Sequence, residues 1–204
     1  MQSAVLYSYR RCPYAMRARM ALRYSNIEVE IREISLKEKP ASMIAASPKA
    51  TVPVLVLASG QVIEQSLDIM NWALEKSDID HWNIQNAAQE ELISANDGSF
   101  KQALDKYKYA IRFPEHPAEV YRAQGEAFLK RLESLLQENT YLLRSTISKA
   151  DIAIFPFVRQ FAMVDEAWFE TADYPALKIW LGTLLNSQIF TDVMQKYPLW
   201  IEAS

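Results

Sequence analysis

The sequence predicts a mixed α/β domain over residues 1–76, followed by an all-helical domain over residues 84–204. Three observations support this division. Up to residue 76, short apolar runs of strand length alternate with stretches of helical periodicity. A polar stretch at residues 77–81 predicts a linker, and strand patterns are absent after it. No internal repeat or low-complexity segment is visible in either part.

The order of elements predicted for the first part is β-α-β-α-β-β-α. Along residues 27–34, Ile and Val alternate with charged residues, which is typical of a half-buried strand. In the preceding helix, Met16, Met20 and Tyr24 are four residues apart on one face. Ser59 and Gly60 predict a tight turn between two strands. The expected elements are, in chain order, 4–7, 14–24, 27–34, 40–46, 54–57, 62–63 and 66–76.

In the second part, apolar residues recur at helical spacing. Phe100, Leu104, Tyr107 and Ile111 are separated by four, three and four residues, and the prolines at 114 and 117 end that helix. Phe128, Leu132 and Leu135 predict the next helix. Residues 150–164 are apolar nearly all round, which predicts a central, buried helix. Two further helices are expected at 176–185 and 189–196.

The composition narrows the range of functions. Half of the 204 residues are apolar and the net charge is −3, with no basic run of the kind that binds nucleic acid. No apolar stretch reaches transmembrane length, and the chain does not begin with a signal-peptide pattern. One cysteine and two histidines make a structural metal site improbable and fit a reducing, cytoplasmic compartment. The four glycines do not form a phosphate-binding loop.

Cys12, the single cysteine, follows the first predicted strand and is followed by Pro13. Proline suits the first position of a helix, so the sulfur is expected at a helix N-terminus, where free N–H groups and the helix dipole favour an anion. Arg10, Arg11 and Arg17 add positive charge. We therefore expect a thiol that ionises more easily than a free one, whose pKa is about 8.5. The simpler alternative is a small buried apolar side chain.

Two further motifs precede predicted elements. Val52 and Pro53 stand at the entry of the third strand, where a cis bond would let the backbone of Val52 pair with an extended peptide. Alternatively, the proline only starts the strand. Ser66 is a favourable N-cap for the helix that follows, and Gln65 can both donate and accept hydrogen bonds. Free N–H groups there would form a carboxylate site, although an ordinary helix cap explains the motif equally well.

Together these motifs, in this order, resemble the glutathione transferase superfamily over nearly the whole chain, with a thioredoxin-like N-terminal domain and a helical C-terminal domain. The run from Cys12 to Ala15 is similar to a glutaredoxin Cys-Pro-Tyr-Cys site with alanine as the last residue, a form typical of omega-like, cysteine-type members. Lys39 matches their lysine for the glycine end of glutathione, and Lys39, Val52 and Gln65 are each thirteen residues apart. Ser148 to Asp151 resembles the family's capping box, a folding feature.

The resemblance implies a binding mode and a reaction. Glutathione, as co-substrate, would pair with Val52 beside Pro53, while Gln65 and Ser66 bind its γ-glutamyl end and Lys39 its glycine end. Cys12 would then attack a glutathione mixed disulfide. Ala15 supplies no second thiol, so a second glutathione completes a monothiol cycle. Gln65 departs from the glutamate of omega-like members, and a shift of one residue would bring Glu64 into its role.

The acceptor pocket is expected where the two domains meet, lined by Tyr14, Tyr107 and Arg112, whereas Trp168 is expected to be structural. The alternative for Tyr107 is packing in the core with Phe100 and Leu104. The acceptor itself is expected to be a small electrophile or a disulfide. The resemblance also implies a homodimer.

The sequence is compatible with three functions. The preferred one is a cysteine-type, glutathione-dependent thiol transferase or reductase. The second is a conjugating transferase that acts on electrophiles, with Tyr7 or Tyr9 activating the sulfur of glutathione. The third is a protein-binding factor of the same fold without enzymatic activity. The presence of Cys12, Lys39, Val52 and Ser66 favours the first over the third.

Overall fold

The structure is a computed structural model that describes residues 3–202, and their contacts form two compact units. One unit runs to Asp80 and includes the chain again from Ser187 onward, while the other comprises His81–Asn186. The predicted combination of an α/β part and an all-helical part is confirmed.

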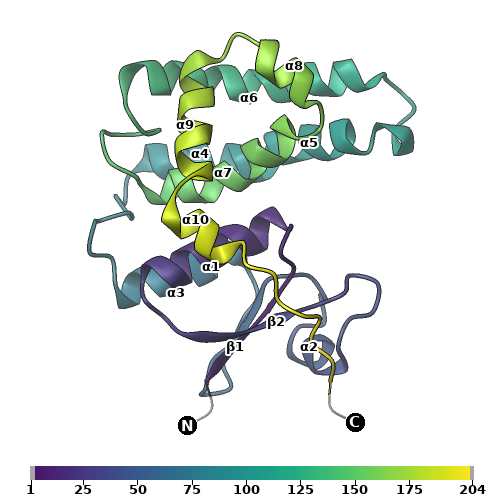
Figure 1. The fold of residues 1–204 in the computed structure, drawn as a ribbon, viewed down its shortest axis with the longest axis vertical. Coiled ribbons are helices and arrows are strands. Elements are labelled where there is room, and N and C mark those ends of the chain that lie inside the picture. Colours follow the sequence, from purple (N-terminus) through teal and green to yellow (C-terminus); the bar gives the residue numbers. More distant parts are fainter. Residues whose placement is uncertain (1–2, 203–204) are drawn as a thin grey trace. The chain divides into compact units, whose positions relative to one another are not determined.

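The first unit contains a four-stranded sheet in the order β2-β1-β3-β4 (Figure 1). β1 pairs with β2 in parallel and with β3 antiparallel, and β3 pairs antiparallel with β4. The order of elements predicted from the sequence is confirmed. The elements are β1 (Ala4–Ser8), α1 (Pro13–Tyr24), β2 (Val29–Glu33), α2 (Ala41–Ala46), β3 (Val54–Val56), β4 (Val62–Ile63) and α3 (Ser66–Lys76).

Helices lie on both faces of this sheet. α1 and α3 pack against each other on one face, and α2 lies on the opposite side (Figure 1). Burial of α1 extends almost all round, because every residue from Ala15 to Leu22 is buried. On the side of α2, Met43 packs with Tyr7, Ile34 and Val54 in a buried cluster. The strand that leads to Cys12 is thus fixed from both faces.

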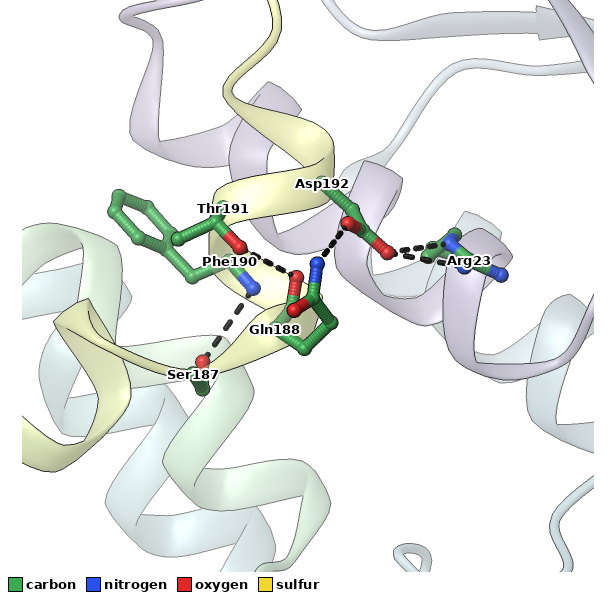
Figure 2. Close-up of polar contacts among 6 residues, drawn as sticks. All are labelled: Arg23, Ser187, Gln188, Phe190, Thr191 and Asp192. Carbon is green, nitrogen blue, oxygen red and sulfur yellow. Dashed lines mark hydrogen bonds and ion pairs between the residues drawn. The ribbon is translucent and has the colours of Figure 1, made fainter.

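The chain returns to the first unit through α10 (Gln188–Val193), a segment that the sequence assigns to the helical domain. The α10 helix packs on α1, and the Asp192 carboxylate accepts hydrogen bonds from Arg23 of α1 and from Gln188 (Figure 2). Ser187 caps the start of α10 through the N–H of Phe190 (Figure 2). The structural boundary between the units therefore lies at residue 187, well before the end of the predicted helical domain.

The second unit is built only of helical elements in its described residues. All residues of α7 are buried except Arg159 and Gln160, and α7 contacts α4, α5 and α9, which confirms the predicted central helix. The elements are α4 (Ala87–Ala95), η1 (Asn96–Phe100), α5 (Lys101–Lys108), η2 (Ala110–Arg112), α6 (Ala118–Glu138), α7 (Lys149–Ala162), α8 (Glu166–Thr171) and α9 (Pro175–Leu185).

The predicted helix through Phe100 and Ile111 is interrupted at both ends. Residues Asn96–Phe100 form a π-helical turn between α4 and α5, and α5 ends at Lys108 before a short 3₁₀ turn. A local change of hydrogen-bond spacing leaves the apolar spacing almost unchanged, so periodicity does not detect it. None of the helices formed by residues 3–202 combines the length and apolar character needed to span a bilayer.

Candidate functional site

Cys12 occupies the N-cap position of α1, with Pro13 at the first helical position, as the sequence predicts. Its own N–H donates to the Tyr9 carbonyl at 3.0 Å, and its carbonyl accepts from the N–H of Met16 at 2.9 Å. The side chain is half-buried rather than enclosed in apolar core. As the N-cap residue, Cys12 lies at the positive end of the helix dipole, a position that favours a thiolate although its side chain makes no cap hydrogen bond to α1.

The structure brings Val52 to this sulfur from 40 residues away in the chain. The Cys12 thiol donates to the Val52 carbonyl oxygen, with 3.8 Å between sulfur and oxygen. The Val52–Pro53 peptide bond is cis. Val52 also packs against the buried cluster of Tyr7, Ile34, Met43 and Val54, which fixes its backbone beside the sulfur.

Ser66 lies at the start of α3, but it does not cap that helix. The helix begins at Ser66 itself, so Gln65, with φ −99° and ψ 135°, holds the N-cap position. The prediction of a Ser66 cap is wrong, because its hydroxyl accepts a hydrogen bond from Nε of buried Arg17 at 2.9 Å. Arg17 belongs to α1, so this bond links the helix of Cys12 to the Gln65–Ser66 turn. Gln65 itself is exposed.

Arg19, which the sequence analysis did not single out, supports the loop before Cys12. Its buried guanidinium donates to the Ser8 hydroxyl, to the carbonyl of Arg10 at 2.8 Å and to the carbonyl of Val193 at 3.1 Å. The N–H of Arg10 in turn donates to Glu33 at 2.7 Å. The signal available in the sequence was an arginine between the apolar residues Ala18 and Met20 of the predicted helix.

The electrostatics of Arg19 connect it with the thiol. Burial lowers the pKa of Arg19 to about 10, while attraction to the charges of Glu33 and Cys12 opposes that effect. A pKa of about 10 leaves the guanidinium positively charged at neutral pH. A thiolate at Cys12 is therefore stabilised by the positive charge of Arg19, in addition to the N–H groups at the start of α1.

The two tyrosines near Cys12 have other partners. The buried hydroxyl of Tyr7 donates to Ser42 at 2.9 Å and accepts from Arg32 at 3.0 Å. The hydroxyl of Tyr9 accepts from Arg11 at 3.0 Å. Tyr7 thus joins the sheet to α2, a structural role that disfavours it as an activator of a bound thiol.

Lys39 and Glu64 lie in the two segments that flank Val52 in the chain. Lys39 is half-buried and stands two residues before α2. Glu64 forms an ion pair with Lys49 at 2.8 Å, and the hydrogen bond from Lys49 lowers the pKa of Glu64. Glu64 is therefore already engaged as an acceptor. Both Glu64 and Gln65 line a cavity of about 600 Å³, together with Asp68 and Asn71.

The predicted acceptor residues are divided between the two units. Tyr14 is half-buried in the first unit, with the Arg17 guanidinium 5.0 Å from its ring centre. In the second unit, Tyr107 is 5% exposed and its ring packs on Phe161, while Arg112 is exposed with its guanidinium over Tyr109. The common pocket of Tyr14, Tyr107 and Arg112 stays a prediction.

Possible metal ligands do not gather in the described part of the chain: no three His, Cys, Asp or Glu side chains among residues 3–202 are arranged to hold a metal ion. The chemistry that the described side chains support is centred on one sulfur, its helix N-terminus and the adjacent Val52 backbone.

Known proteins match both units. The family described as "Glutathione S-transferase, N-terminal domain" matches residues 6–80, and "Glutathione S-transferase, C-terminal domain" matches residues 87–182. Glutathione S-transferase omega-1 of Rattus norvegicus is 26% identical over 189 residues, which cover 90% of this chain and 77% of that protein.

Solved structures share the fold at lower identity. Glutathione transferase URE2P6 of Phanerochaete chrysosporium, in complex with oxidised glutathione, has a TM-score of 0.81 at 18% identity and covers 94% of each chain. Glutathione transferase Omega 3C of Trametes versicolor has a TM-score of 0.78 at 18% identity, covering 97% of this chain and 91% of its own.

The two matched domains and the fold define the class: this chain belongs to the glutathione transferase superfamily. Within that superfamily it is omega-like, as the relatives named omega-class transferases show.

Proposed function

We propose that this protein is a glutathione-dependent thiol transferase or reductase that works through Cys12. One observation carries the proposal: the half-exposed sulfur of the only cysteine lies at the N-terminus of α1, 3.8 Å from the carbonyl oxygen of Val52. Val52 is the residue that the family resemblance implies as the backbone partner of glutathione. A nucleophile and a peptide-binding backbone are therefore adjacent.

The proposed binding mode lays glutathione along the first unit. Its central peptide pairs with the Val52 backbone beside Pro53, as an added strand would. Its γ-glutamyl end meets Gln65 and Ser66, and its glycine carboxylate meets Lys39. Structures of family members with glutathione or oxidised glutathione bound support this choice of ligand.

The proposed reaction is a monothiol disulfide exchange. The Cys12 thiolate attacks the glutathione sulfur of a mixed disulfide, forming a Cys12–glutathione disulfide and releasing the acceptor as a thiolate that takes up a proton. A second glutathione thiolate then attacks this disulfide, which releases oxidised glutathione and restores the Cys12 thiolate. Ala15 offers no sulfur for an internal resolving step.

The residues around the sulfur stabilise its anion. Ionisation of Cys12 gives up the hydrogen bond to Val52, so other groups must compensate for that loss. The N–H groups at the start of α1 and the charged guanidinium of Arg19 supply this compensation. We also propose a homodimer, tested by light scattering, and a small electrophilic or disulfide-type acceptor that meets Tyr14, Tyr107 and Arg112.

The first prediction is that Cys12→Ser reduces exchange with a glutathionylated peptide to the uncatalysed rate, because hydroxyl oxygen is a far poorer nucleophile than a thiolate at neutral pH. Glutathione should still bind to this variant in calorimetry. Intact-mass measurement of the native protein with oxidised glutathione should show one glutathionyl adduct, which the variant lacks, since Cys12 is the only cysteine.

The matched control is Tyr9→Phe, which removes the hydroxyl expected to act in a conjugating transferase. Exchange activity should be unchanged in this variant. Conjugation of an aryl halide that persists in Cys12→Ser and is lost in Tyr9→Phe would instead favour the conjugating alternative. Absence of any glutathione binding to the native chain would favour the non-enzymatic one.

A further inference from the structure

The segment formed by residues 198–202, called the strap below, crosses the first unit beside β2 and α2. The N–H of Trp200 donates to the carbonyl of Glu33 at 2.8 Å, and Leu199 forms a parallel bridge with Glu33. Since β2 is an edge strand of the sheet, the strap occupies hydrogen-bonding positions that the sheet leaves open there. It thus begins as a short continuation of the sheet.

The strap ends by capping α2. This helix has only six residues, its N-cap is Pro40, and no side chain from its own start caps it. Instead, the Glu202 carboxylate accepts from the N–H groups of Ala41 at 2.9 Å and Ser42 at 3.1 Å. A helix this short is not stable by itself, and its first N–H groups need acceptors. The acceptor for α2 comes from 161 residues further along the chain.

Trp200 of the strap packs on side chains that are themselves connected to α2. Its ring lies 4.3 Å from the Arg32 guanidinium and meets the ring of Tyr7 edge-on, with 6.0 Å between ring centres. Arg32 donates to the hydroxyl of Tyr7, which itself donates to Ser42 of α2. Trp200 also packs on the buried cluster that Val52 contacts. The strap is therefore connected both to α2 and to the backbone beside Cys12.

The charge on Glu202 suits this cap. Hydrogen bonding from the Ser42 hydroxyl, together with the N–H groups of Ser42 and Ala41 and the charge of Arg32, lowers the pKa of Glu202. The carboxylate is therefore ionised at neutral pH and faces the positive end of the α2 dipole. Ile201, between Trp200 and Glu202, is 85% exposed.

We propose that Trp200 and Glu202 are positioning residues for glutathione, because they hold α2 and the Lys39–Pro40 segment that leads into it. This inference rests on the proposed function, in which Lys39 and Val52 contact glutathione. Glu202 fixes the peptide groups of Ala41 and Ser42, directly after Pro40. Without the strap, α2 keeps its contacts through Met43 and Ser42 but loses the acceptor for its first N–H groups, directly after the backbone that carries Lys39. Cys12 keeps its own supports in α1 and Arg19.

The test is the affinity of the full-length protein for reduced glutathione, measured by calorimetry. Glu202→Ala should bind glutathione about fivefold more weakly. In this variant α2 lacks its cap in the free protein, and binding must supply the free energy that the cap supplies in the native protein. Glu202→Gln, which keeps one carbonyl acceptor, should fall between this variant and the native protein. The turnover number at saturating glutathione should be unchanged, whereas a general loss of folding would reduce it.

Ile201→Ala is the matched control, because it alters the strap at a side chain that is almost fully exposed. Its affinity should equal that of the native protein. Equal affinities of Glu202→Ala and Ile201→Ala would overturn the positioning role and leave the proposed function intact. Failure of the native protein to bind glutathione would overturn the proposed function itself, and the positioning role with it.

Discussion

At the scale of single residues, Gly125 shows how closely the helical unit is packed. A Cβ atom at this position would lie 2.4 Å from Cε2 of Phe161, far inside van der Waals contact. Phe161 is fully buried and its ring packs on Phe100, Tyr107 and Trp168, so it has no free space into which to turn. Gly125 in α6 is therefore required by the position of the Phe161 ring.

We expect Gly125→Ala to destabilise the protein by up to about 2 kcal/mol. Overpacking of a core costs about 1–3 kcal/mol, and the better helix propensity of alanine returns about 1 kcal/mol of that. Chemical denaturation measures the change in the free energy of unfolding. Gly182→Ala is the control: this glycine lies in α9 with open space around it, so the variant should be about 0.5–1 kcal/mol more stable. Stabilisation of both variants would contradict the packing argument.

The residues of the candidate site were predictable to different degrees. Cys12 and Val52 were predicted because both stand next to a proline at the end of an element, and such local signals persist in the fold. The Ser66 cap was wrong because its hydroxyl pairs with Arg17, 49 residues away. Arg19 was missed for the same reason, since its partners come from β1, from the loop after it and from α10. Local sequence does not encode such distant partners.

At the scale of elements, periodicity predicted the strands and most helices to within a few residues, because burial on one face imposes the spacing of apolar side chains. It did not predict the π-helical turn at Asn96–Phe100, where hydrogen bonding changes and spacing hardly does. Nor did it predict α4, a helix of nine residues, or α8, a helix of six residues with a single buried side chain. Short elements contain too few turns to establish a period.

The capping box of α7 was predicted, and the structure adds two partners to it. Asp151 accepts from the N–H and hydroxyl of Ser148, as expected, and also from the N–H of Leu142 at 2.9 Å and the indole of Trp180 at 2.9 Å. Burial raises the pKa of Asp151, and these four donors oppose that effect. The carboxyl group thus holds α7, the loop before it and α9 together.

We expect Asp151→Ala to lower the free energy of unfolding by about 3–5 kcal/mol, since it leaves several buried donors without an acceptor. Asp151→Asn should lose somewhat less, because one carbonyl oxygen remains while the amide N–H₂ opposes a donor. Thermal denaturation followed by circular dichroism measures both. Glu166→Ala, at an exposed position in the first turn of α8, is the control and should change stability little. An Asp151→Ala variant as stable as this control would show that the capping box does not contribute to the free energy of unfolding.

At the scale of the whole molecule, the sequence predicted two parts but not the return of the chain to the first one. Residues 189–196 have helical periodicity like the helices before them, so pattern alone assigns them to the helical domain. The residues after Asn186 are held in the first unit by distant partners. Arg23 donates to Asp192 (Figure 2), Arg19 donates to the Val193 carbonyl, and the first N–H groups of α2 donate to Glu202. In chain order, the first unit is therefore completed only by residues that follow the second unit.

This arrangement predicts a response to acid. Hydrogen bonds from Gln188 and Arg23 lower the pKa of Asp192, and those from Ser42 and Ala41 lower the pKa of Glu202. A carboxyl group whose pKa is lower in the folded state stabilises that state above its ordinary pKa of about 4. The stabilisation is lost as the pH falls through the lowered value. Residues 188–202 should therefore leave the first unit below about pH 4, before the helical unit unfolds.

The measurement is an NMR titration of the indole N–H resonance of Trp200, assigned with Trp200→Phe. Between pH 7 and pH 4 the resonance should be constant, and below that it should move toward the position of an exposed indole, while the backbone amide resonance of Leu129, buried in α6, stays in place. The variant with both Asp192→Asn and Glu202→Gln should show the exposed position at pH 7 in a larger fraction of molecules and should titrate less. A Trp200 resonance that moves only together with that of Leu129 would mean that the two units lose structure as one, and that the carboxylates do not hold the returning segment by themselves.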